Sequence, residues 1–162
     1  MRLLITGSPG TGKSLIAQKL GQMLKAKVVN EKDLALREGI GQWNHEENEL
    51  EIPLGKLKKA CVKELKKSKN VILEGHILCE LKLNVDAVIV LRADPELLQE
   101  RLSRRYKNME KVFDNVFIEG IDYCKKYAFR NYGKKAFEAR NEKGIKDTLS
   151  NILKELKERG VM

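Results

Sequence analysis

Apolar residues recur along the chain either in short unbroken runs or at intervals of three and four residues. The short runs predict strands over residues 2–6, 27–29, 71–73 and 87–91. The run 87–91 contains no polar residue, which is typical of a parallel strand covered on both faces. Residues 136–139 are a candidate fifth strand. We therefore expect a parallel sheet.

The intervals of three and four residues predict helices between these strands. They cover residues 13–25, 57–65 and 95–105, and the last has Asp94 as its N-cap and Pro95 at its first position. A closing amphipathic helix is marked by Ile145, Leu149, Ile152, Leu153 and Leu156. Strands that alternate with helices predict a three-layer α/β fold, and because no linker interrupts the pattern we expect one domain over residues 1–162.

The segment Gly7–Ser14 matches the pattern G-x-x-x-x-G-K-[ST], between the first predicted strand and the first predicted helix. Glycines such as Gly10 and Gly12 let the backbone wrap a polyphosphate so closely that its N–H groups point inward. Lys13 is expected on the β- and γ-phosphates, and the Ser14 hydroxyl on Mg²⁺. The motif predicts binding of ATP or GTP together with magnesium.

The composition excludes several classes of protein. With 34% charged residues and a mean hydropathy of −0.43, the chain has no apolar run near the roughly 18 residues that cross a bilayer. Its first residues turn to Gly, Ser and Pro before a signal-peptide core could form, so we expect a cytoplasmic protein without membrane contact. Cys61, Cys79 and Cys124 are widely spaced, which argues against a disulfide framework and against a structural zinc site.

Charge is distributed unevenly along the chain. The net charge is +9, acidic residues crowd between positions 31 and 51, and seven lysines lie between Lys56 and Lys69. The lysines form either a solvated helix face, which is the commoner case, or a contact for RNA. The acidic segment suits a basic protein partner. The charge pattern alone does not separate these interpretations.

Four segments together resemble the small nuclear and archaeal-type adenylate kinases, which also act in ribosome assembly. They are Gly7–Ser14, Asn30–Ala35, Leu73–His76 and Val90–Arg105. The resemblance implies a P-loop NTPase fold with a five-stranded parallel sheet and helices on both faces, an NMP-binding segment at about 30–52 and a lid at about 104–114. It also implies transfer of the ATP γ-phosphate to AMP or another nucleoside monophosphate, ATPase activity, and a role in small-subunit maturation through binding of a ribosomal protein.

The resemblance further implies roles for individual residues. The ATP-binding positions are Gly10, Thr11, Gly12, Lys13, Ser14, Leu15 and Arg105. The catalytic positions are Lys13, Glu74, His76 and Arg105, and the magnesium ligands are Ser14 and Glu74. The substrate-binding positions in the NMP-binding segment are Asp33 and Arg37. Asn115 and Glu119 match the family's Asn-x-x-x-Glu after the lid.

The chain departs from the family pattern at several of these positions. Glu74 stands where the family usually has Asp, Leu15 where it often has Thr, and Tyr106-Lys107 where it commonly has Gly-Tyr. Arg37 lies one position later than the family's arginine, which keeps open a kinase for another small metabolite. An ATPase switch for ribosome assembly with little kinase activity is the other alternative.

Two of the candidate residues have a second interpretation from the residues alone. His76 lies two positions after Glu74 at a strand end, so it is expected to face the nucleotide crevice and to orient water or phosphate. A strand-end histidine can instead be held by a structural hydrogen bond. Arg105 is either a cation of the lid or an exposed arginine at a helix end.

Overall fold

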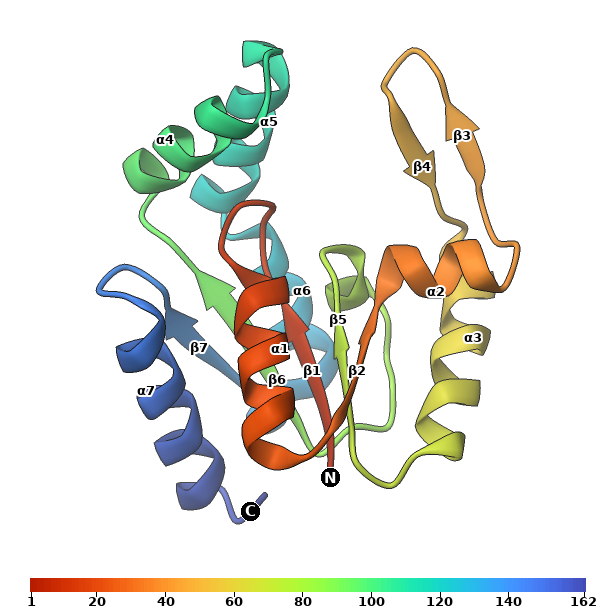
Figure 1. Ribbon diagram of the computed structural model, residues 1–162, viewed down its shortest axis with the longest axis vertical. Coiled ribbons are helices and arrows are strands. Elements are labelled where there is room, and N and C mark those ends of the chain that lie inside the picture. The colour runs from red at the N-terminus through yellow and green to blue at the C-terminus, as the bar shows by residue number, and fades with distance from the viewer.

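The computed structural model describes residues 1–162 and contains a five-stranded sheet and a separate two-stranded hairpin. The main strands lie in the order β2-β5-β1-β6-β7, and all neighbours are parallel, with β1 at the centre (Figure 1). Their bounds are β1 Arg2–Thr6, β2 Lys27–Asn30, β5 Val71–Glu74, β6 Ala87–Arg92 and β7 Ala136–Arg140. The predicted parallel sheet is confirmed, including its fifth strand.

Helices and one hairpin connect these strands. The helices are α1 Lys13–Leu24, α2 Glu31–Arg37, α3 Leu54–Lys67, α4 Pro95–Arg105, α5 Met109–Gly120, α6 Tyr123–Tyr132 and α7 Ile145–Glu158, with short 3₁₀ turns η1 Ile77–Glu80 and η2 Gly133–Lys135. The hairpin consists of β3 Gln42–Asn44 and β4 Glu49–Glu51. Asp94 caps α4 as predicted, because its side chain accepts from the N–H of Glu96 at 2.9 Å. The sequence did not predict α2, α5, α6 or the hairpin.

The sheet is covered on both faces because consecutive residues of a strand point to opposite sides. On β1, Leu3 and Ile5 belong to a core with the buried residues of α1 and α7. Leu4 points the other way, into a core with α2, α3 and α6. The predicted three-layer arrangement is therefore confirmed. None of the helices combines the length and the apolar character that a membrane crossing needs.

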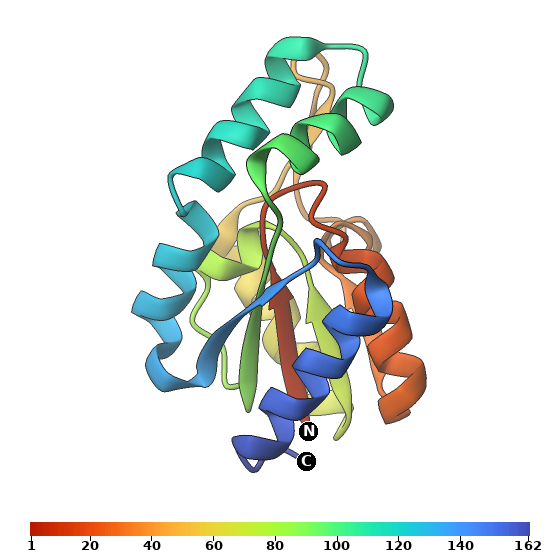
Figure 2. The ribbon, with the colours of Figure 1, turned by 90° about the vertical axis from the view of Figure 1, so that its left-hand side faces the viewer.

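Two structures project from the edge of the sheet where β1, β5 and β6 end. One is the pair α4 and α5, and the other is the hairpin of β3 and β4 (Figure 1). Figure 2 shows α5 descending from the top of the molecule toward α6. In open parallel sheets ligands bind beyond the carboxyl ends of the strands, so this edge is where a site is expected.

Candidate active site

The segment between β1 and α1 has the conformation of a phosphate-binding loop. Gly12 has φ +94°, and a Cβ there would lie 2.5 Å from Nδ2 of Asn141. The same Nδ2 donates to the carbonyl of Thr11 at 2.9 Å, which holds the loop against the β7–α7 connection. The amide of Ile16 donates to the Gly12 carbonyl at 3.1 Å. The preceding amides at the start of α1 are free of such helical bonds, and they can bind the oxygens of a polyphosphate.

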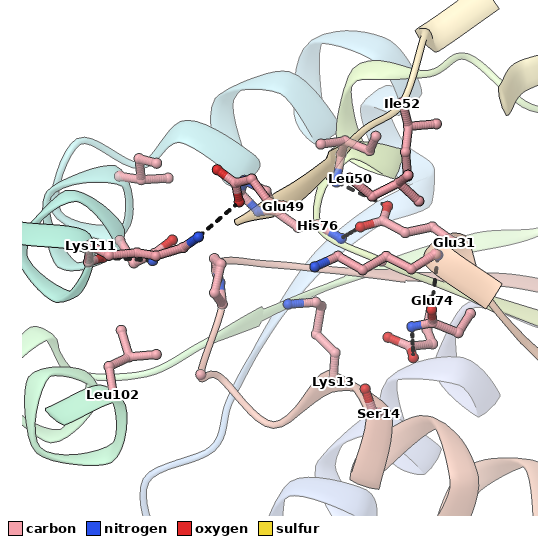
Figure 3. Close-up of a pocket in the computed structure, with 18 of the residues that line it drawn as sticks. Lys13, Ser14, Glu31, Glu49, Leu50, Ile52, Glu74, His76, Leu102 and Lys111 are labelled. Atoms are coloured by element: carbon pink, nitrogen blue, oxygen red, sulfur yellow. Dashed lines mark hydrogen bonds and ion pairs between the residues drawn. The ribbon is translucent and has the colours of Figure 1, made fainter. Parts of the chain in front are cut away.

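Lys13 extends from the first turn of α1 into the space enclosed by this loop (Figure 3). Its Nζ donates to the carbonyl of Ser8 at 3.0 Å. Burial lowers the pKa of Lys13, against the opposing effect of Cys124 and of the carboxylates Glu31 and Glu74. A poorly solvated ammonium in this position gains from contact with an anion, so the loop and Lys13 together fit a nucleotide polyphosphate.

A cavity of about 890 Å³ opens in front of the loop, within the range of about 300–1,000 Å³ that is usual for ligand sites. Its walls come from the phosphate loop, the start of α2, the end of β5 with η1, strand β4, and helices α4 and α5. The predicted site residues that line it are Gly10, Gly12, Lys13, Ser14, Leu15, Glu74, His76 and Arg105. Most of the predicted site is thus gathered around one cavity.

Glu74 and Ser14 lie at one corner of this cavity. Glu74 is buried at the end of β5 and accepts from Nδ2 of Asn30 at 2.6 Å. Both residues also line a second cavity of about 460 Å³, which Asp33 borders as well. A hydroxyl and a carboxylate beside the phosphate loop are the kind of oxygen ligands that Mg²⁺ prefers. The donor set therefore fits magnesium, and the longer side chain of Glu74 reaches the same corner.

Glu31 is a second buried carboxylate in the cavity wall, at the start of α2. Its oxygens accept from the backbone N–H of His76 at 2.7 Å and of Ile77 at 3.1 Å. Burial raises the pKa of Glu31, while the hydrogen bond from the His76 amide and the charge of Lys13 act in the opposite direction. Glu31 fixes the turn between β5 and η1, and this turn carries His76.

His76 is held by a structural hydrogen bond and also lines the cavity. Its Nδ1 lies 3.1 Å from the carbonyl of Gly7 and 3.4 Å from Sγ of Cys124, and its ring stacks on Tyr123 at 6.2 Å. Nδ1 is thus engaged inside the protein. Burial lowers the pKa of His76, but the hydrogen bond and charge of Cys124 outweigh it and the net pKa is raised.

Helix α4 brings two arginines to the cavity, Arg101 and Arg105. Arg101 donates from Nη2 to the carbonyl of Asn141 at 2.9 Å, and its Nη1 is buried without a partner. The guanidinium of Arg105 lies 5.5 Å from the ring of Tyr106. Arg104, by contrast, does not line the cavity and pairs with Glu100 on its own helix. Arg101 is thus a stronger candidate for anion binding than its sequence position indicates.

Lys111 on α5 bridges the cavity to the hairpin (Figure 3). Its Nζ lies 3.3 Å from Oε2 of Glu49 and donates to the carbonyl of Glu47 at 3.0 Å. The hairpin adds Leu50 and Ile52 to the cavity wall. The space in front of the phosphate loop is therefore bounded on the opposite side by residues 47–52.

Comparisons with known proteins decide the family. A family model described as "AAA domain" matches residues 3–122. A protein of Thermococcus kodakarensis named "Putative adenylate kinase" is 43% identical over 122 residues, which are 75% of this chain and 66% of that protein. A protein of the same name from Methanocaldococcus jannaschii is 35% identical over 125 residues, which are 76% of this chain and 70% of that protein. The chain belongs to this adenylate kinase family.

The fold of this family member is also similar to solved kinase structures. Shikimate kinase from Aquifex aeolicus has a TM-score of 0.65 at 19% identity and covers 99% of both chains. Deoxyadenosine kinase from M. mycoides has a TM-score of 0.63 at 16% identity and covers 97% of this chain and all of that one. At this identity the likeness establishes the P-loop kinase fold. The match to the Thermococcus protein spans just under two thirds of that protein's length.

Three of the predicted site residues lie outside the main cavity. Thr11 is buried and donates from its hydroxyl to the Ser8 carbonyl at 2.9 Å, so it shapes the loop from inside. Asp33 borders only the smaller cavity. Arg37 pairs with the buried carboxylate of Glu64 on α3 at 3.0 Å. The geometry gives no support to a contact between Arg37 and a monophosphate.

Several residues of the candidate site were not expected from the sequence. Glu31, Lys32 and Lys111 line the cavity, and Asn141 holds the loop. Glu31 directly precedes the residues Lys32 and Asp33 of the NMP-binding segment, and Asn30 caps α2 by accepting from both of their amides. This N-cap pattern signals a helix start, where a carboxylate is favoured by the helix dipole. No local signal marks Asn141 or Lys111, because their partners are distant in sequence.

Proposed function

We propose that the chain is a nucleoside monophosphate kinase that transfers the γ-phosphate of ATP to AMP, with Mg²⁺. The observation that carries the proposal is that one cavity is bounded by the phosphate loop on one side and by the predicted NMP-binding segment on the other. Two nucleotides bound on these two sides would therefore bring their phosphates close together for direct transfer. The family relationship supports the same reaction class.

The chain's own residues would perform this transfer by positioning and by offsetting charge. Lys13 and the amides of α1 hold the β- and γ-phosphates of ATP. Arg101 and Arg105 place cationic charge on the transferring group from the side of α4. Ser14 and Glu74 would hold Mg²⁺, which supplies further positive charge at the phosphates when bound.

A bound monophosphate carries negative charge, so a cation is expected near it on the acceptor side of the cavity. Arg37, which the family resemblance implies for this role, is engaged with Glu64. Lys32 lines the cavity and offers the charge instead, whereas Lys111 would first have to leave its ion pair with Glu49. Leu50 and Ile52 provide apolar surface for a base, and Asp33 remains a candidate only toward the smaller cavity. This arrangement supports a nucleotide acceptor over a small hydrophilic metabolite.

ATP hydrolysis is a second proposed activity of the same site. It is favoured by His76, whose Nδ1 is held by the Gly7 carbonyl while the residue faces the cavity. Such a ring can orient a water toward the γ-phosphate when no monophosphate is bound. If transfer to a monophosphate is slow compared with hydrolysis, the chain is an ATPase with little kinase activity.

Macromolecular partners are proposed from charge. The hairpin exposes Trp43 together with acidic residues, which suits a basic protein such as a small-subunit ribosomal protein. Lysines between Lys56 and Lys69 are exposed along α3, which suits RNA. Pull-down of purified ribosomal protein, with and without ATP, tests the first contact. The salt dependence of RNA binding tests the second.

One assay separates the enzymatic candidates. ADP and inorganic phosphate are measured from ATP alone and with AMP, CMP, GMP, UMP or shikimate as acceptor. A kinase of monophosphates gives ADP in excess of inorganic phosphate, and AMP gives the largest excess. Equal ADP and phosphate under every condition indicates an ATPase, and stimulation by shikimate alone indicates a small-metabolite kinase.

A further inference from the structure

A buried ionic cluster joins the phosphate loop to α5. Its centre is Arg92 at the end of β6, which forms ion pairs with Glu119, with Asp122 at 2.6 Å and with Glu138 at 3.2 Å. Glu119 is almost fully buried at the end of α5. Its second oxygen accepts from the hydroxyl of Ser8 in the phosphate loop at 2.6 Å. Of the three carboxylates around Arg92, only Glu119 contacts this loop.

Ser8 connects Glu119 onward to Lys13. While its hydroxyl donates to Glu119, its carbonyl accepts from Nζ of Lys13 at 3.0 Å. The same carbonyl accepts from the hydroxyl of Thr11 at 2.9 Å. The position of Glu119 therefore determines where Ser8 lies, and Ser8 in turn fixes the ammonium group proposed to bind the phosphates.

The opposite end of α5 reaches the acceptor side of the cavity. Lys111, Asn115 and Glu119 follow one another at intervals of four residues, so they lie on one face of the helix. Lys111 contacts the hairpin through Glu47 and Glu49, and Asn115 lines the cavity between the two ends. A helix of this length is stiff, so a shift at one end is transmitted to the other.

We propose that Glu119 is a positioning residue that couples α5 and the adjoining lid to the phosphate loop. The proposal rests on ATP binding by that loop. Because the coupling is a free energy shared by two sites, ATP at the loop favours one placement of the lid, and this placement favours ATP equally. Ser8 connects Glu119 on α5 to Lys13 in the phosphate loop. The ionic partners Asp122 and Glu138 stabilise Arg92 without contributing to the coupling.

Trypsin cleavage of the exposed lid measures this coupling. The cleavage sites are Arg104, Arg105 and Lys107, and ATP binding is followed separately with a fluorescent ATP analogue. In the wild type, saturating ATP slows lid cleavage. In Ser8→Ala and Glu119→Gln, saturated to the same degree, lid cleavage is at least fivefold faster, the Kd for the ATP analogue rises by about the factor by which the protection falls, and kcat falls at least tenfold.

Asp122→Asn and Glu138→Gln are the matched controls. Each removes one ion pair of Arg92, and Asn still accommodates the φ of +59° at position 122. In both variants ATP slows lid cleavage as much as in the wild type, even where the variant has a lower melting temperature. Wild-type protection in a folded Ser8→Ala, or equal loss in all four variants, overturns the proposal. If the wild type binds ATP but its lid is not protected, the coupling is wrong and the kinase proposal stands; if it binds no ATP, both fail.

Discussion

Glu31 occupies the space that a side chain on Gly75 would need. A Cβ on Gly75 would lie 2.1 Å from Oε2 of Glu31, closer than any tolerated contact. The carboxylate uses this space to accept from the amides of His76 and Ile77. The absence of a side chain on Gly75, directly after β5, is therefore required for the close approach of Glu31 from the start of α2.

Gly75→Ala is predicted to displace Glu31 and to break both of its hydrogen bonds. We expect a loss of about 1–3 kcal/mol in the free energy of unfolding, because the carboxylate and two amides lose their partners. Urea unfolding measures this loss. Gly55→Ala is the control, since nothing lies within 4 Å of a Cβ there, and because Gly55 lies within α3 the variant is as stable as the wild type or more stable by up to about 1 kcal/mol. Equal stability of the two variants would contradict the role of Gly75.

Arg105→Ala is predicted to lower kcat for monophosphate phosphorylation tenfold or more, with a smaller effect on ATP affinity. The reason is that a cation is lost from the transferring phosphoryl group. Arg104→Ala is the neighbouring control, because Arg104 is exposed, pairs with Glu100 and does not line the cavity. Steady-state kinetics measure kcat and the apparent affinity for ATP in both variants. A change confined to ATP affinity would make Arg105 a binding residue only.

His76→Ala is predicted to weaken ATP hydrolysis more than AMP phosphorylation. AMP brings its own phosphate nucleophile, whereas a water must be oriented by the protein. Parallel assays of both activities on one preparation measure the ratio. His45→Ala serves as control, because His45 is exposed on the hairpin connection. Equal losses would show that His76 acts on ATP generally, and no loss would leave it a structural residue.

Glu64→Gln is predicted to change the pH dependence of stability. The hydrogen bond from Lys27, with Lys67 and Arg37 nearby, lowers the pKa of Glu64 to about 2. Since an unfolded glutamate titrates near pH 4.3, the ionised group stabilises the fold above that value, and the stabilisation is lost as the pH falls toward 2. Urea unfolding of wild type and variant from pH 7 to 3 should show a gap that narrows below about pH 4.5. A constant gap would contradict this assignment.

The sequence predicted those parts of the fold that depend on local pattern. The strands were found because they are buried runs, and α4 because Asp94 and Pro95 mark its start. Helix α5 was missed because Phe113 and Phe117 are exposed on its outer face, so apolar residues occur on both sides and blur the helical pattern.

The candidate site was predictable only where one segment carries the signal. The phosphate loop is such a segment, since its backbone geometry requires its glycines. The pairing of Arg37 could not be predicted from the sequence. Its partner Glu64 is a single acidic residue in a lysine-rich segment, and only the fold shows that Glu64 is buried. The contact of Glu31 with the turn after β5 joins residues about 45 positions apart, and no local pattern encodes it.

The central claim is that the γ-phosphate passes directly from ATP to a monophosphate in the cavity. Incubation with AMP and ATP labelled in the γ-phosphate, followed by separation of the products, tests it most directly. We predict that the label appears in the β-phosphate of ADP, and that folded Lys13→Ala transfers none because the phosphates lose their fixed cation. Label recovered only in inorganic phosphate, with AMP unchanged, would contradict the claim.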